Sequence, residues 1–151
     1  MVGQFPHAPI HGLEKIKNLD DAYCSQQHFV QALSEKLGPT KGKRVGYKVG
    51  FTGKGGQKKF GIPHPAVGVL LNNMFIENPS EIAADFGFRP MIEPDLMVIV
   101  KDDRIMQAST IKEVAESLES LHACIELPTI LFPQDTPCLL YTSDAADDVE
   151  C

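Results

Sequence analysis

Three acidic side chains lie in or beside apolar segments of this chain, and their types and spacing could support metal chemistry. Glu93 and Asp95 are two residues apart in MIEPDLMVIVK, and Glu126 lies in CIELP. Residues two apart on a strand project from the same face, ~6.6 Å apart. Ionised carboxylates are costly to bury unless they are paired or bind a metal. Oxygen ligands suit magnesium, manganese or calcium, so the three acids predict a Lewis-acid site.

The same acids have a second interpretation. Glu93 and Asp95 could be solvated carboxylates at a strand end, and Glu126 could form a salt bridge. A two-residue acid repeat is a weak signal, because acidic side chains usually lie at the surface. Spacing alone therefore favours the solvated interpretation, and further features must decide between the two.

Lys48 is the basic candidate, flanked by apolar residues and glycines in GYKVG. Glycines let a ligand approach the backbone closely, and a lysine there could orient an oxyanion or carry a proton. The alternative is a strand lysine that faces solvent, which the residues alone favour. None of the five histidines shows metal-ligand spacing with another histidine, so all are expected to be structural or surface residues, and GFTGKGG lacks the residue order of a P-loop.

The composition describes an ordinary globular chain and argues against two classes of partner. The 151 residues are 43% hydrophobic and 23% charged, which indicates one domain or a piece of one. No apolar run is long enough to span a membrane and no signal peptide is evident, so we expect a cytoplasmic protein without membrane contact. The net charge of −6 argues against nucleic acid as a partner. The four cysteines are expected to be reduced thiols.

Turn residues and periodicity predict both helices and strands. Asn18 is a good N-cap for a helix that should stop at Gly38 and Pro39. Thr110 and Glu113 form a capping box, and the apolar face of the helix that follows should continue to Leu121. A short helix is expected at 57–60, and strands are expected at 44–52, 67–71, 91–101 and 122–127. Pro94 cannot donate to a strand ladder, so its strand should lie at an edge or carry a bulge.

The last segment of the chain, residues 138–151, has no periodicity of either kind. Its string CLLYTSDAAD is the translation of DNA that resembles a transposase sequencing adapter. We therefore expect that the natural reading frame is lost near Pro137 and that this tail is not native. The alternative is a genuine disordered acidic tail. The tail is left out of the expectations about the fold.

Four segments in order carry a resemblance to a known family: GYKVGFTGKGGQKKFGI, PAVGVLLNNM, RPMIEPDLMVIV and CIELP. Over residues 18–130 the chain resembles the 2-keto-4-pentenoate hydratases and 2-oxo-3-hexenedioate decarboxylases of the fumarylacetoacetate hydrolase-like superfamily. The resemblance implies an α+β fold, a mixed β-roll or sandwich with flanking helices. Residues 1–137 would be the N-terminal part of that catalytic domain, and the full-length protein would be a homo-oligomer.

The resemblance also implies a site. Glu93, Asp95 and Glu126 would bind Mg²⁺ or Mn²⁺, and Lys48 would lie near the acid and keto groups of a small 2-oxo acid substrate. The implied activity is that of a metal-dependent lyase in aromatic-compound catabolism. It would be a hydratase acting on 2-hydroxypenta-2,4-dienoate or a related decarboxylase. The metal would polarise the ketone and stabilise the enolate. The alternatives are an acylpyruvate-type carbon–carbon bond hydrolase and an inactive truncated fragment.

One position departs from the family pattern. The family has Asp before Met in G-x-L-x-x-D-M, and this chain has Asn73 before Met74. An amide can hydrogen-bond but cannot carry a proton as a carboxylate does. We therefore assign two catalytic residues, Lys48 and Asn73. We expect that Asn in place of Asp at position 73 alters the proton-transfer step of the hydratase reaction and leaves metal binding unchanged.

Overall fold

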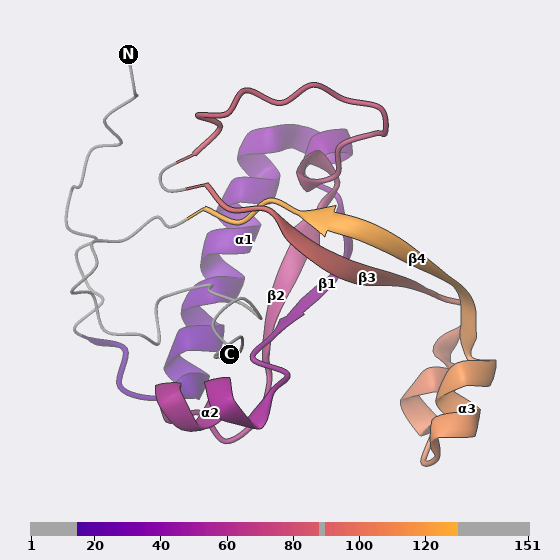
Figure 1. Cartoon of the computed structure of the whole chain (residues 1–151). Coiled ribbons are helices and arrows are strands. Elements are labelled where there is room, and N and C mark those ends of the chain that lie inside the picture. Colours follow the sequence, from indigo (N-terminus) through magenta and orange to yellow (C-terminus); the bar gives the residue numbers. More distant parts are fainter. Residues whose placement is uncertain (1–14, 88–89, 130–151) are drawn as a thin grey trace. The chain divides into compact units, whose positions relative to one another are not determined.

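The computed structural model describes residues 15–87 and 90–129, which fall into two compact units (Figure 1). The first unit contains α1 (Leu19–Lys41), β1 (Arg44–Gly50), α2 (Lys54–Phe60) and β2 (Ala66–Leu71). The second contains β3 (Glu93–Val100), α3 (Ile111–Glu116) and β4 (Leu118–Glu126). The tail at 138–151 that we expect to be non-native lies outside the described residues.

Helix α1 begins where its sequence predicts. The Asn18 side chain accepts a hydrogen bond from the Asp21 backbone N–H at 2.8 Å, which confirms Asn18 as the N-cap. The predicted stop is also visible, because Gly38 leaves the helical conformation at φ 81° and ψ 179°. The chain then makes one more helical turn to Lys41. Pro39 suits the start of that turn, since its fixed φ is helical and the first position needs no N–H partner.

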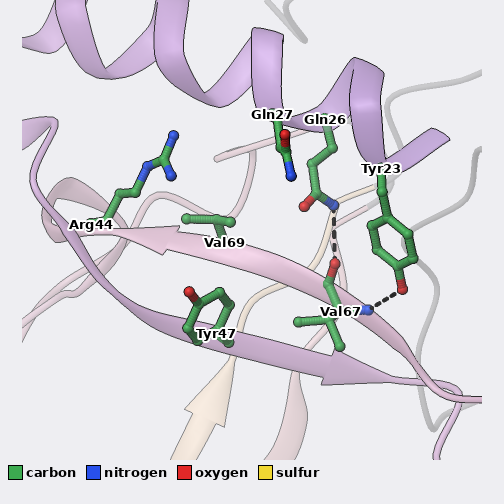
Figure 2. Close-up of a pocket in the computed structure, with 7 residues that line it drawn as sticks. All are labelled: Tyr23, Gln26, Gln27, Arg44, Tyr47, Val67 and Val69. Atoms are coloured by element: carbon green, nitrogen blue, oxygen red, sulfur yellow. Dashed lines mark hydrogen bonds between the residues drawn. The ribbon is translucent and has the colours of Figure 1, made fainter. Parts of the chain in front are cut away.

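Strands β1 and β2 form an antiparallel ribbon whose outer edge is covered by α1. The Tyr23 hydroxyl accepts from the Val67 N–H at 3.1 Å, and Gln26 Nε2 donates to the Val67 carbonyl at 3.0 Å (Figure 2). Both backbone groups of Val67 therefore bond to side chains of α1. An uncovered strand edge is a template for pairing with another chain, so these two side chains protect β2. Leu71, at the end of β2, is fully buried.

Strands β3 and β4 form a second antiparallel ribbon, and here one expectation was wrong. Leu118 and Leu121 were expected on the apolar face of a helix, but α3 ends at Glu116 and both residues lie in β4. Leu121 pairs with Val98 and Leu118 with Val100. For residues 118–121, pairing with the apolar strand β3 is more favourable than continuing α3, because each residue added to so short a helix contributes little stability. The Ser117 hydroxyl donates to the Glu113 carbonyl at 2.8 Å at the point where the helix stops.

The connection between β3 and β4 is fixed by two local carboxylates. The capping box at Thr110 and Glu113 is confirmed, and hydrogen bonds from the backbone and side chain of Ser109 lower the pKa of Glu113. Asp102 accepts two hydrogen bonds from the Arg104 guanidinium, at 2.6 and 2.8 Å. These bonds are the main cause that lowers the Asp102 pKa to about 2. Both carboxylates organise the turns that lead into α3.

The described residues combine helices with two small antiparallel sheets, each of two strands. Pro94 lies in β3 opposite Ile125, and the one irregularity of this ribbon falls at its other end, between Ile99 and Val100. The expected mixed β-roll or sandwich concerns how such sheets combine, and it stays a prediction. In the described ranges, no helix is both long and apolar enough to cross a membrane.

Candidate functional site

The three predicted metal ligands lie on one face of the β3–β4 ribbon. Glu93 pairs directly with Glu126, and Asp95 pairs with Cys124. Residues opposite each other in an antiparallel pair share a face, and so do residues two apart on one strand. Glu93, Asp95 and Glu126 therefore project from the same side of the ribbon, near the end where β3 begins and β4 finishes.

Burial and charge make this end of the ribbon unusual. Glu93 is only 7% exposed, and Asp95 and Glu126 are half-buried. Like charges directly opposite in a sheet are destabilising, and a buried carboxylate loses its hydration. A bound cation would offset both costs at Glu93 and Glu126. The donors are all carboxylate oxygens, which is the set that a hard divalent ion prefers.

Although Glu93, Asp95 and Glu126 share a face, their carboxylates do not converge on one position. Within residues 15–87 and 90–129, no group of three or more His, Cys, Asp or Glu side chains lies close enough to hold a metal ion. Asp95 is turned toward its own strand, where its Oδ1 accepts from the Leu96 N–H at 2.7 Å. Metal ligation by all three acids would require Asp95 to leave this local hydrogen bond.

Lys48 belongs to the first unit and lies in β1. It pairs with Gly68 of β2 and is half-buried. Its Nζ donates to the Val49 carbonyl at 3.2 Å, so the ammonium group lies close to the strand backbone. A glycine opposite the lysine leaves room beside its stem for another molecule.

The register of the first ribbon sets Asn73 apart from Lys48. Asn73 is exposed in the 3₁₀ turn Asn72–Met74, which follows the end of β2. The last residue of β2, Leu71, pairs with Arg44, and Arg44 is four residues from Lys48 along β1. Four strand residues span about 13 Å, which exceeds the reach of a lysine side chain. The pairing of β1 with β2 therefore argues against direct proton transfer between Lys48 and Asn73.

Gln57 is a residue to which the sequence analysis assigned no role. It is 5% exposed on α2, and its Nε2 donates to the Phe51 carbonyl at 2.8 Å. Its Oε1 accepts from Lys54 Nζ at 3.0 Å. Phe51 has a positive φ of 54°, which is costly for an aromatic residue. The Gln57 amide thus holds the turn that follows Lys48. The signal available from the sequence was a Gln at a fixed place in the family-like GYKVGFTGKGGQKKFG segment.

A groove of about 230 Å³ lies between α1 and the β1–β2 ribbon (Figure 2). Val67 and Val69 contribute apolar surface, and Arg44 and Tyr23 lie at its opposite ends. Neither Lys48 nor Asn73 lines it. Its volume is below the range of ordinary small-molecule sites, about 300–1,000 Å³. We assign no ligand to this groove.

Comparison with known proteins identifies relatives with one kind of activity. No protein-family model matches the chain. The chain is 24% identical over 123 residues to a 2-keto-4-pentenoate hydratase of Paraburkholderia xenovorans. It is 27% identical over 120 residues to the TodF product hydratase of a Pseudomonas putida strain. It is 32% identical over 83 residues to the 2-oxo-hept-4-ene-1,7-dioate hydratase of Escherichia coli.

The matched regions cover much of this chain but less than half of each relative. The first match spans 81% of the chain and 44% of the Paraburkholderia protein. The second spans 79% and 43%, and the third 54% and 29%. These matches confirm the resemblance that the ordered sequence segments predict.

Proposed function

We propose, from the premise that this chain is related to the 2-keto-4-pentenoate hydratases, that the whole protein is a hydratase-like lyase of aromatic-compound catabolism. Its substrate would be a small 2-oxo acid or the corresponding 2-hydroxy-dienoic acid. The observation that carries the proposal is the common face of Glu93, Asp95 and Glu126 in a chain whose relatives are hydratases.

The proposed cofactor is Mg²⁺ or Mn²⁺, held by Glu93, Asp95 and Glu126. The donor set supports this choice, because carboxylate oxygens favour hard divalent ions. When bound, the ion would supply Lewis-acid polarisation of the substrate's keto group. Glu93 and Glu126 would face the ion as a directly opposed pair, and Asp95 would exchange its bond to the Leu96 N–H for ligation.

Lys48 is the basic residue proposed to contact the substrate, because it lies in the family-like GYKVG segment. An ammonium group is a compact donor that suits a substrate carboxylate or enolate oxygen. The Gln57 amide does not contact the substrate in this proposal. It holds the turn at Phe51, which directly follows the strand that carries Lys48, and so helps to position that strand. Lys48 would hold the acid group of the substrate in one orientation, which lowers the entropic part of the barrier.

Asn73 bears on which lyase reaction is catalysed. Its amide cannot pass a proton, and Asn73 follows the end of β2 that pairs with Arg44, about 13 Å along β1 from Lys48. The decarboxylase reaction is therefore the second candidate, favoured if hydration in this family depends on a carboxylate at this position. Asn73→Asp in the complete protein separates the two: a gain in hydratase rate indicates that the amide limits hydration.

The decisive experiment uses the complete reading frame. The metal-depleted protein is mixed with 2-hydroxypenta-2,4-dienoate, and loss of the dienol absorbance is followed with and without Mg²⁺ or Mn²⁺. We expect turnover that depends on the metal and is lost in Glu93→Gln. Glu119→Gln is the matched control, because Glu119 is an exposed acid outside this face of the ribbon. A folded protein that turns over neither this compound nor a 2-oxo-3-enedioate would contradict the proposal.

A further inference from the structure

A cysteine and a histidine lie in contact on the surface of α1, and neither is among the residues proposed for the lyase site. Cys24 and His28 are one helical turn apart, so both project from the same face. Cys24 Sγ and His28 Nδ1 are 3.9 Å apart. Both residues are exposed, and Cys24 forms no disulfide.

The separation of these two atoms is close to what a shared metal ion requires. Zinc binds thiolate sulfur at about 2.3 Å and imidazole nitrogen at about 2.0–2.1 Å in tetrahedral geometry. Two such bonds at the tetrahedral angle place the sulfur and nitrogen about 3.6 Å apart. The observed 3.9 Å needs only a small rotation of exposed side chains to close.

The imidazole is already oriented toward the cysteine. His28 Nδ1 lies 2.9 Å from the Cys24 carbonyl oxygen, and a carbonyl only accepts, so Nδ1 carries the hydrogen in this state. This bond holds the ring above the preceding turn, beside the thiol. Metal binding at Nδ1 would exchange one exposed hydrogen bond for a coordinate bond, and exposed bonds of this kind contribute little net free energy.

We propose that Cys24 and His28 form a two-residue chelate for a borderline-soft divalent cation such as Zn²⁺. Thiolate and imidazole select ions of this class over magnesium or manganese, so the chelate differs in chemistry from the carboxylate face of the β3–β4 ribbon. The proposed chelate uses these two protein ligands and water, and within residues 15–87 and 90–129 no group of three acidic, His or Cys side chains could hold an ion. The bound ion links two successive turns of α1 and stabilises the helix.

The test titrates Co²⁺ into the full chain, because a thiolate bound to cobalt gives a charge-transfer band in the near ultraviolet. A parent variant with Cys124→Ser, Cys138→Ser and Cys151→Ser keeps Cys24 as its single cysteine, and the unsubstituted chain is titrated beside it. We expect both to bind one cobalt per chain at this site and α1 to melt at a higher temperature when cobalt is present. Cys24→Ser should abolish the band in the parent, and His28→Ala should weaken binding by roughly tenfold or more.

A spacing control separates chelation from binding by the thiol alone. His28→Ala combined with Gln31→His keeps one cysteine and one histidine on the same helix face, but about 10 Å apart along the helix axis. This variant should bind cobalt as weakly as His28→Ala. Equal affinity of the spacing control and the parent would overturn the proposal. So would a stoichiometry of two chains per cobalt, or a parent that gives no band while circular dichroism shows an intact helix.

Discussion

Glu93 and Glu126 lie directly opposite each other in the β3–β4 ribbon, although they are 33 positions apart in sequence. Their pairing joins the buried carboxylate of the ribbon to a half-buried one on the same face. A slip of one residue in this register would move the Glu126 side chain to the other face. The register therefore determines whether the candidate ligands can act together.

Glu126→Gln should have opposite effects on the metal-free and the metal-bound protein. Without metal, removal of one of two opposed negative charges should stabilise the fold by about 0.2–1 kcal/mol. With Mg²⁺ or Mn²⁺, the variant should lose the stabilisation that the ion gives to the parent. Thermal melts of the complete protein, with chelator or with metal, measure both effects. Glu119→Gln is the control, and a metal-induced shift that survives in Glu126→Gln would remove Glu126 from the ligand set.

Gln57→Ala should destabilise the first unit by about 1–3 kcal/mol. The substitution removes a buried amide and leaves the Phe51 carbonyl without its 2.8 Å donor, so the positive φ of Phe51 loses its support. Urea denaturation followed by circular dichroism gives the free energy of unfolding. Gln31→Ala is the matched control, because Gln31 is exposed and its amide donates to the Glu35 carboxylate within α1. Equal midpoints for both variants would mean that the buried amide has no special role.

Tyr23→Phe combined with Gln26→Ala should expose the outer edge of β2. The double variant removes both hydrogen bonds to Val67, and each is worth about 0.5–1.5 kcal/mol. The uncovered edge should also promote association between chains. Unfolding midpoints and light scattering as a function of concentration measure the two effects. Gln27→Ala, on the same helix, should leave both unchanged, and a double variant that behaves like this control would refute the edge-covering role of α1.

The turn between β3 and α3 should become less stable at acidic pH, because protonation of Asp102 weakens its hydrogen bonds with Arg104. Its pKa is lowered in the folded protein, from 3.8 to about 2, chiefly by the hydrogen bond from the Arg104 side chain. The stability that Asp102 contributes to the folded protein is therefore fully present above about pH 4, and it is lost as the pH falls toward 2. Glu113 acts in the same direction, because its pKa is also lowered.

Carboxyl chemical shifts measured against pH test this dependence. The Asp102 titration should have its midpoint near 2, and Arg104→Gln should move that midpoint upward toward 3.8. Lys112→Gln is the control, since Lys112 is exposed and its ion pair is with Glu116. A midpoint for Asp102 that does not respond to Arg104→Gln would show that another group lowers its pKa.

Local sequence patterns predicted the features that depend on neighbouring residues. The N-cap at Asn18 and the capping box at Thr110 and Glu113 form as expected, because a short polar side chain and the first N–H groups of a helix are only three residues apart. The common face of Glu93 and Asp95 follows from strand geometry in the same way. The break at Gly38 also follows from the residue itself, since its φ of 81° is accessible mainly to glycine.

Tertiary structure decided the features that depend on distant partners. Leu118 and Leu121 lie in a strand and not in the expected helix, because they pair with Val100 and Val98 of β3. The helical spacing of apolar residues in their own segment gives no information about this distant partner. Gln57 gained its role only when the chain folded back on Phe51. The sequence placed Glu93 and Asp95 on one face, and the antiparallel register alone brought Glu126 to that face. Side-chain periodicity fixes direction within a strand, whereas pairing between strands depends on how remote apolar runs meet.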